Sequence, residues 1–356
     1  TKVRYETFNP ASRQQIADRL MEKHGWKPSE FTDTGQPKVD EDVLASLPFP
    51  ECKPLVDYLE LLKIIGMLAE GKNGWLKLVG LDGRIHGRVI TNGAVTGRCT
   101  HNSPNLAQIP ARGQYGKQCR ALFAAPPPLV QVGADASGLE LRMLAHYLAA
   151  YDGGAYAKVL LEGDIHTANQ HAAGLETRDN AKTFIYAFLY GAGDEKLGSI
   201  VAPLASSAVQ TKRGRALKDR FFRSLPAIKR LIDDVQGVLT GPGKRPYLIG
   251  IDGRHLHIRS SHSALNTLLQ SAGAVLMKLA TVIFHMEAQR RGLRLGGDYA
   301  QVLHVHDEAQ FNTTPEKADA LGKLFVESIE LAGRHFGMRC PTTGEFKVGA
   351  NWAETH

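Results

Sequence analysis

Residues 178–193, RDNAKTFIYAFLYGAG, restrict the fold of this chain most, because they form a two-sided helical pattern. At about 100° per residue, side chains at steps of four share one stripe of a helix, and a neighbouring arc is apolar. The stripe consists of Arg178, Lys182, Tyr186 and Tyr190, and the arc consists of Ala181, Phe184, Ile185 and Phe188. The pattern predicts a helix whose arc packs on a core while its stripe faces outward.

The ends of this segment also favour a helix. Thr177 is a suitable N-cap, and Gly191 and Gly193 are typical of a helix end. Cations on the stripe suit phosphates, and aromatic rings suit sugars and bases. An ordinary amphipathic helix with solvated cations would show the same pattern, and the helix alone does not decide between the two interpretations.

Length and charge set the wider frame. A chain of 356 residues exceeds a usual single core, so we expect two or three subdomains. The net charge of +7 favours a polyanionic partner. Four dispersed cysteines without a CxxC pair indicate free thiols in a reducing compartment, and the sequence shows neither a signal pattern nor an apolar run of about 20 residues. We therefore expect a soluble, cytoplasmic protein.

Two further segments place aspartates at strand ends. Residues 129–134 predict a short buried strand, with Asp135 where it ends and a helix starting at Gly138. A carboxylate there is costly unless it meets a cation, a metal or several donors, although a helix cap is the plainer use. Residues 301–313 predict two strands joined at His306 and Asp307, and hairpin tips commonly carry Asp.

Taken together, these signals suit one reaction. Asp135 and Asp307, converging at one sheet edge, could hold two Mg²⁺ ions through carboxylate oxygens. Such a metal pair clamps both oxygens of an in-line phosphoryl displacement. Cationic and donor side chains would neutralise a triphosphate and read the DNA minor groove. For the triphosphate these are Arg178, Lys182 and His166, and for the minor groove Arg98 and Gln270.

The motifs resemble those of a known family. They are DASGLELR at 135–142, GDIHT at 163–167, RDNAKTFIYAFLYGAGDEK at 178–196, ALNTLLQSAGA at 264–274, VHDE at 305–308, TGRCTH at 96–101, PNLAQIP at 104–110 and the terminal NWAETH. In this order they resemble the family A DNA polymerases, the DNA polymerase I family, and most of all its T-seven-type podophage replicative branch. The resemblance extends over nearly the whole chain.

The resemblance implies an α/β (α+β) fold shaped as a right hand, with an antiparallel palm sheet, a helical fingers insert and a truncated thumb base. It implies four parts: a thumb-base helical lead-in at 1–74, the first part of the palm at 75–147, the fingers at 148–265 and the second part of the palm at 266–356. About 74 residues before the palm are too few for a proofreading exonuclease domain plus a thumb. We therefore expect no proofreading by this chain.

The resemblance also implies a role for each site residue. The expected metal ligands are Asp135, Asp307 and the backbone carbonyl of Ala136, with Glu308 as an auxiliary acid beside the primer end. The expected nucleotide-binding residues are Glu140, Tyr186, His166, Arg178 and Lys182. Glu140 would exclude a ribose 2′-hydroxyl. His166, Arg178 and Lys182 would bind the triphosphate, and Lys182 would also protonate the departing pyrophosphate. The expected DNA-binding residues are Arg98, Gln270 and His306 at the primer-terminal pair, Asn266 on the template side, and Tyr190 and Gly191 by the templating base.

The implied activity is template-directed DNA synthesis with primer–template DNA, dNTPs and two Mg²⁺ ions. The phage branch recruits thioredoxin through a thumb insertion, and nothing in the sequence corresponds to it, which argues against that partner. Three alternatives stay open: a catalytically idle DNA-binding fragment, an RNA-synthesising relative, against which Glu140 argues, and a metal-dependent nuclease.

Overall fold

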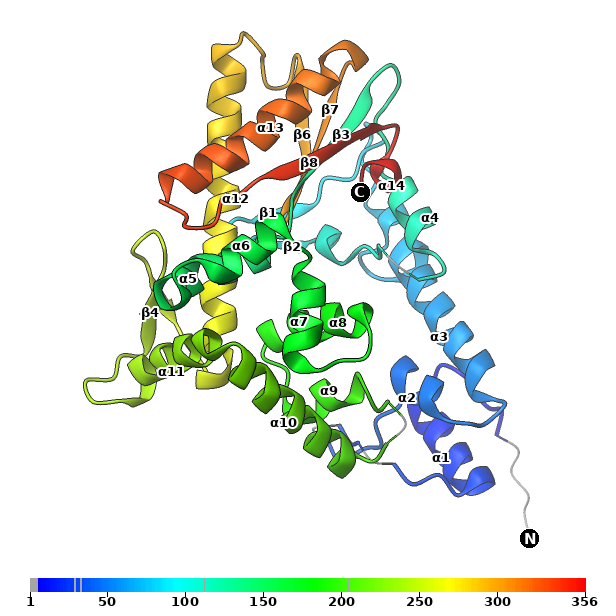
Figure 1. Cartoon of the computed structure of the whole chain (residues 1–356). Helices are drawn as coiled ribbons and strands as arrows, with labels where there is room; N and C mark the ends of the chain where they lie inside the picture. The colour runs from blue at the N-terminus through cyan, green and yellow to red at the C-terminus, as the bar shows by residue number, and fades with distance from the viewer. Residues whose placement is uncertain (1–5, 29, 33, 112, 204) are drawn as a thin grey trace. The chain divides into compact units, whose positions relative to one another are not determined.

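A computed structural model of the chain describes two compact units (Figure 1). The described residues are 6–28, 30–32, 34–111, 113–203 and 205–356. The first unit ends at Gly87, and the second comprises Arg88–His356. The proposed division into thumb base, palm and fingers stays a prediction.

The first unit is helical. Its helices are α1 (Arg13–His24), α2 (Glu41–Ser46) and α3 (Cys52–Ile65), followed by a π-helical turn at Gly66–Glu70 and a 3-10 turn at Trp75–Lys77. Ser12 caps α1 by accepting a hydrogen bond from the Gln15 amide, and Gly25, at φ +63°, ends it. The three helices enclose a small core that includes Ile16 and Leu44.

The second unit is built on a four-stranded antiparallel sheet in the order β6-β7-β3-β8. These strands are β3 (Val130–Ala136), β6 (Tyr299–Val305), β7 (Glu308–Thr313) and β8 (Gly344–Gly349), and two short pairs accompany them, β1 (Arg88–Ile90) with β2 (Thr100–Asn102) and β4 (Tyr247–Ile249) with β5 (His255–His257). Strand β3 is central and reaches Ala136, two residues beyond the predicted end. Pairing with β7 and β8 on either side carries it past Asp135, so the predicted end of the strand was wrong by two residues.

Most of the helices of this unit lie in the segment between β3 and β6, and the others come before β3 or after β7. They are α4 (Gly116–Ala121), α5 (Leu139–Asp152), α6 (Ala155–Glu162), α7 (Ile165–Ala173), α8 (Arg178–Leu189), α9 (Asp194–Ser199), α10 (Ser207–Ser224), α11 (Pro226–Thr240), α12 (Ala264–Arg290), α13 (Pro315–His335) and α14 (Trp352–Thr355), with short 3-10 turns at Leu106–Gln108 and Ser261–Ser263. The predicted α/β class with an antiparallel sheet is confirmed.

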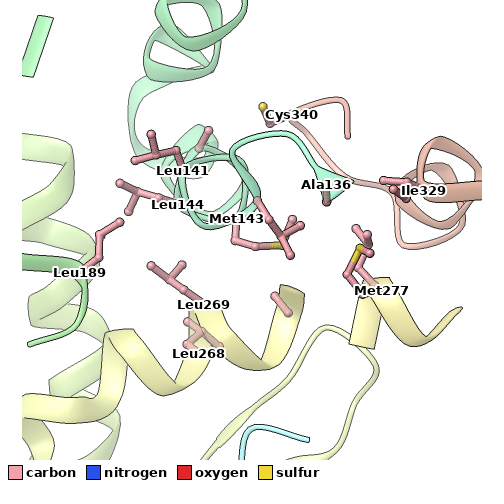
Figure 2. Close-up of a cluster of buried hydrophobic side chains, with 14 of the residues drawn as sticks. Ala136, Leu141, Met143, Leu144, Leu189, Leu268, Leu269, Met277, Ile329 and Cys340 are labelled. Atoms are coloured by element: carbon pink, nitrogen blue, oxygen red, sulfur yellow. The ribbon is translucent and has the colours of Figure 1, made fainter. Parts of the chain in front are cut away.

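The core of the second unit ties the end of β3 to three helices. Figure 2 shows side chains of α5, such as Leu144, facing Leu268 and Leu269 of α12, with Leu189 at the end of α8 beside them. Apolar burial of this kind contributes roughly 1.5–3 kcal/mol per large side chain, which makes this junction a rigid base for β3 and α8.

Helix α12 contributes many of the buried side chains of this core. It belongs to a segment, Ser261–Arg290, that is long and apolar enough to cross a membrane by length and composition, which the sequence pattern did not predict. Within the most apolar window, 61% is buried inside the protein, as in the core helix of a globular fold.

Helix α8 confirms the two-sided pattern. Ala181, Phe184 and Ile185 are fully buried, and the stripe residue Lys182 is exposed. The Thr177 hydroxyl accepts a hydrogen bond from the Asn180 amide, as expected of an N-cap. One face of α8 is thus fixed to the core, and the other is free for a ligand.

Candidate active site

The two predicted metal-binding aspartates lie at neighbouring strand ends. In the register of β3 and β7, Asp135 is opposite Glu308. The Ala136 amide donates a hydrogen bond to the Asp307 carbonyl at 3.0 Å. The turn between β6 and β7 is tight enough to hold His306 at φ +56°, a conformation that non-glycine residues rarely adopt. The backbone therefore brings Asp135 and Asp307 side by side.

The carboxylates of this site repel one another. Burial, followed by the charges of Asp307 and Glu308, raises the pKa of Asp135 to about 8. Burial and the charge of Glu140 raise the pKa of Asp307 to about 6, although Arg98 opposes this. Within the described part of the chain, no cationic side chain forms an ion pair with Asp135 or Asp307. When the two carboxyl groups ionise, their negative charge lacks a paired cation and favours a bound one.

The donor set fits magnesium rather than a metal that needs a complete protein cage. Among the described residues, no three His, Cys, Asp or Glu side chains are grouped so as to hold a metal on their own. Two adjacent carboxylates, Asp135 and Asp307, are what Mg²⁺ uses when water and substrate phosphates complete its shell. Ala136, whose carbonyl is the third predicted ligand, is the last residue of β3.

Glu308 occupies a different environment, because its carboxylate points into a buried polar cluster. Glu308 is 4% exposed. Its Oε1 accepts hydrogen bonds from both Trp352 Nε1 and Gln310 Nε2, and its Oε2 lies 3.0 Å from His356 Nδ1. Burial opposes ionisation, but the bonds with His356 and Gln310 hold the pKa of Glu308 below its usual range. The Arg120 guanidinium is 3.9 Å from Glu308 and 4.3 Å from the Trp352 ring centre.

Three cationic or titratable side chains gather at the start of α8. Arg178 forms a two-pronged ion pair with Asp164, at 2.7 and 3.2 Å. Asp164 also caps α7 by accepting hydrogen bonds from the amides of His166 and Thr167. Burial, and then the charges of Arg178 and Lys182, lower the pKa of His166. Asp164 thereby fixes Arg178 beside His166.

The other end of α8 meets the acidic site through Glu140. The Tyr190 hydroxyl donates a hydrogen bond to Glu140 Oε1 at 3.0 Å, and the Arg98 guanidinium is 3.3 Å from the same oxygen. Burial and the charge of Glu140 raise the pKa of Tyr190 to about 12, so its hydroxyl keeps the proton that it donates. Tyr186 lies one turn before Tyr190 on α8. The charges of Glu140, Asp307 and Asp135 add to burial in raising the pKa of Tyr186.

The remaining predicted DNA-binding residues lie on α12, just after α8 and in the turn between β6 and β7. Gln270 donates a hydrogen bond from Nε2 to Asn266 Oδ1 at 2.7 Å, so the two side chains act as one unit on α12. Gly191 has φ +78°, and a Cβ there would be 3.4 Å from the His262 carbonyl. The Nδ1 atom of His306 is buried without a hydrogen-bond partner in the described structure.

Comparison with known proteins identifies the family. A family model described as DNA polymerase family A matches residues 1–354. The chain belongs to this family. It is 47% identical to a DNA-directed DNA polymerase of Enterobacteria phage T3 and 46% identical to one of Escherichia phage T7, in both cases over 100% of this chain and 54% of the relative. The chain therefore spans about half the length of these relatives.

A solved structure shares the fold of this family A chain. The POL domain of Pol1 from M. smegmatis, in complex with DNA primer-template and dNTP, has a TM-score of 0.83 and 23% sequence identity. The likeness covers 98% of this chain and 62% of that one. At this identity the comparison establishes the architecture.

Sequence reasoning assigned no role to several residues that shape this family A site. Asp164 lies within the GDIHT motif but is 14 positions from Arg178, too far for a local pattern to pair the two. Trp352 lies in the NWAETH motif, 44 positions from Glu308. Arg120 carried no pattern at all. The contacts of Trp352 and Arg120 depend on how α14 packs on the sheet and α4 on α14, which no local spacing encodes.

Proposed function

We propose that this chain catalyses template-directed DNA synthesis, in which a primer 3′-hydroxyl attacks the α-phosphorus of a template-paired dNTP. The oxygen bridging the α- and β-phosphates then leaves with pyrophosphate. The observation that carries the proposal is the pair of uncompensated aspartates, Asp135 and Asp307, near a helix whose far end bears Arg178 and Lys182.

Asp135 and Asp307, with the Ala136 carbonyl, would hold two Mg²⁺ ions. When bound, these ions would supply charge neutralisation at the attacking and leaving oxygens. The raised pKa values of the two aspartates support this assignment, because carboxyl groups that resist ionisation alone ionise readily beside a cation.

The residues on α8 would bind and protonate the polyphosphate. Arg178 and His166 are held together by Asp164 and would contact the outer phosphates. Lys182 is one helical turn nearer the acids, about 6 Å along the helix axis. It is exposed and lacks an ion-pair partner among the described residues, so its ammonium is free to give a proton to the departing pyrophosphate oxygen.

The residues around Glu140 would select the sugar and the template base. Glu140, whose charge acts on Tyr186, would occupy the space that a ribose 2′-hydroxyl would need. Tyr190, bonded to Glu140, would stack by the templating base, and Gly191 would permit its close approach. Arg98, Gln270 and His306 would contact the primer-terminal pair, and Asn266 the template. The reaction would take place in the host cytoplasm, with primer–template DNA and dNTPs as partners.

The experiment is a primer-extension assay with the 356-residue chain, labelled primer–template and Mg²⁺, with and without dNTPs. We expect extension by the wild type, and none by Asp135→Ala or Asp307→Ala, which should still bind DNA. Asp319→Ala on α13, which removes an exposed acid paired with Lys323, is the matched control and should extend normally. Extension by either catalytic-site variant would contradict the proposal.

The same assay tests the alternatives. A wild type that binds DNA but never extends the primer would be an idle binding fragment. A primer shortened without nucleotides would indicate a nuclease, and rNTP incorporation equal to dNTP incorporation would indicate an RNA-synthesising enzyme.

A further inference from the structure

The β4–β5 hairpin presents an outward face that the proposed reaction does not use. Antiparallel pairing sets Tyr247 opposite His257 and Ile249 opposite His255. The alternate residues, Leu248 and Leu256, are 5% and 0% exposed and anchor the hairpin to the core. Because successive side chains of a strand point to opposite faces, the tyrosine, the isoleucine and the two histidines share the outer one.

The outward face carries a stack of rings. Tyr247 and His255 lie parallel, with centroids 3.9 Å apart and planes at 10°. His257 meets Tyr247 edge-on at 6.0 Å, and the Arg245 guanidinium is 5.7 Å from the tyrosine ring centre. His255 is exposed, so the stack ends in a ring open to solvent. Planar side chains held in this way form a surface on which another flat group can stack.

The same hairpin is strongly cationic. Residues 244–259 contain four basic side chains, Lys244, Arg245, Arg254 and Arg259, and one acid. That acid, Asp252, is already paired with Arg254 at 2.6 Å. In the part of the chain that the structure describes, Lys244, Arg245 and Arg259 form no ion pair, and all three are exposed. The positive charge of these three side chains is therefore available to an external anion.

The hairpin also adjoins the residues assigned to the template. The chain leaves β5 through the 3-10 turn Ser261–Ser263 and enters α12, two residues before Asn266. The His262 carbonyl is 3.4 Å from the position of a Cβ at Gly191, and the Arg254 guanidinium is 2.5 Å from that at Gly97, next to Arg98. The hairpin therefore leads directly into the helix that bears Asn266, and its Arg254 lies close to the residue before Arg98.

We propose that the outward face of β4–β5 binds the unpaired template strand ahead of the templating base. This inference rests on the proposed function, which supplies such a strand. Unpaired bases expose their faces for stacking on side chains, whereas bases within a duplex are already stacked on their neighbours. The cations would follow the phosphates between those bases. An acidic protein would match the charge of the hairpin but would leave its stacked rings unused.

The test compares two labelled duplexes by fluorescence anisotropy, one with a one-nucleotide template overhang and one with about ten thymidines, within the span a single-strand site covers. We expect the wild type to bind the long overhang more tightly. His255→Ala should lower that affinity about tenfold, the effect of losing one base–ring stack, and leave the short-overhang affinity unchanged. His255→Phe, which keeps a ring, should retain most of the gain.

The charge contribution is measured separately. Arg245→Ala should reduce the slope of log affinity against log salt by about 0.7 for the long overhang only, as expected for one lost phosphate contact. The matched controls are His335→Ala and Arg334→Ala on α13, where His335 is likewise exposed and lies edge-on to Phe336 at 5.1 Å. Both controls should behave as the wild type.

The outcomes separate this inference from the proposed function. Equal wild-type affinity for the two overhangs, or equal losses by His255→Ala on both, would overturn the template-strand assignment. Primer extension on the short overhang should be unaffected by His255→Ala. A wild type that binds the long overhang preferentially but extends neither substrate would refute the proposed function and leave the binding surface in place.

Discussion

Replacing Asp135 with asparagine should stabilise the metal-free protein at alkaline pH. The Asp135 carboxyl group is partly buried among the acids Asp307, Glu308, Glu345 and Glu140, and burial comes first among the causes that raise its pKa to about 8. Above that pH the wild type must hold the charge without a partner. Asparagine keeps the size and shape of the side chain and removes the charge.

The magnitude follows from proton linkage. A carboxyl group whose folded-state pKa is raised binds its proton more tightly in the folded state, so stability falls as pH rises from about 4 to about 8. The difference between about 8 and the ordinary 3.8 corresponds to ~6 kcal/mol at 1.36 kcal/mol per pKa unit. Water entering the open side of the site reduces this, and we expect a gain of roughly 2–4 kcal/mol at pH ~8.5, falling below ~2 kcal/mol at pH ~5.

Urea denaturation in EDTA, followed by circular dichroism, measures the effect. Asp319→Asn, which alters an exposed acid with a cationic partner, should change stability little at either pH. Mg²⁺ should reverse the order of wild type and Asp135→Asn, because only the wild type keeps both carboxylates. A variant no more stable than the wild type at pH ~8.5, or equally stabilised at both pH values, would refute the electrostatic reasoning.

Two further substitutions test the neighbouring residues. Lys182→Ala should slow single-turnover extension by about 10²–10⁴-fold, the usual contribution of a proton donor, with little change in DNA affinity; weakened DNA binding at an unchanged rate would contradict this role. Glu140→Ala should admit rNTPs, whereas Glu140→Gln, which keeps the bulk, should still exclude them in a competition between rNTP and dNTP; equal exclusion by both variants would show that Glu140 does not select the sugar.

Local patterns predicted the parts of this site that are local. The arc of α8, its Thr177 cap and the β6–β7 turn bearing Asp307 follow from spacing and residue type within about a dozen positions. The end of β3 was misplaced because its last pairs depend on β7 and β8, which come more than 170 positions later. Strand length in a sheet is set by partners as well as by its own sequence.

Contacts between distant segments could not be predicted in this way. Glu308 shows the consequence most clearly. Its position in the VHDE motif suggested an acid beside the primer end, and that role stays a prediction. The structure places its carboxylate against Trp352, Gln310 and His356, which together satisfy a buried charge. An acid one position after Asp307 thus has its charge compensated by hydrogen bonds, whereas Asp307 does not.

The two halves of the site carry opposite charges that the fold keeps apart. Asp135 and Asp307 lack a cation, and Lys182 lacks an acid among the described residues, although α8 reaches the acids through the bond between Tyr190 and Glu140. The buried arc of α8 prevents the helix from turning to pair them. A fold shaped only for stability would gain by closing that gap. The gap suits the proposed ligand, because a nucleoside triphosphate with its magnesium ions would offer positive charge to the aspartates and negative charge to the lysine.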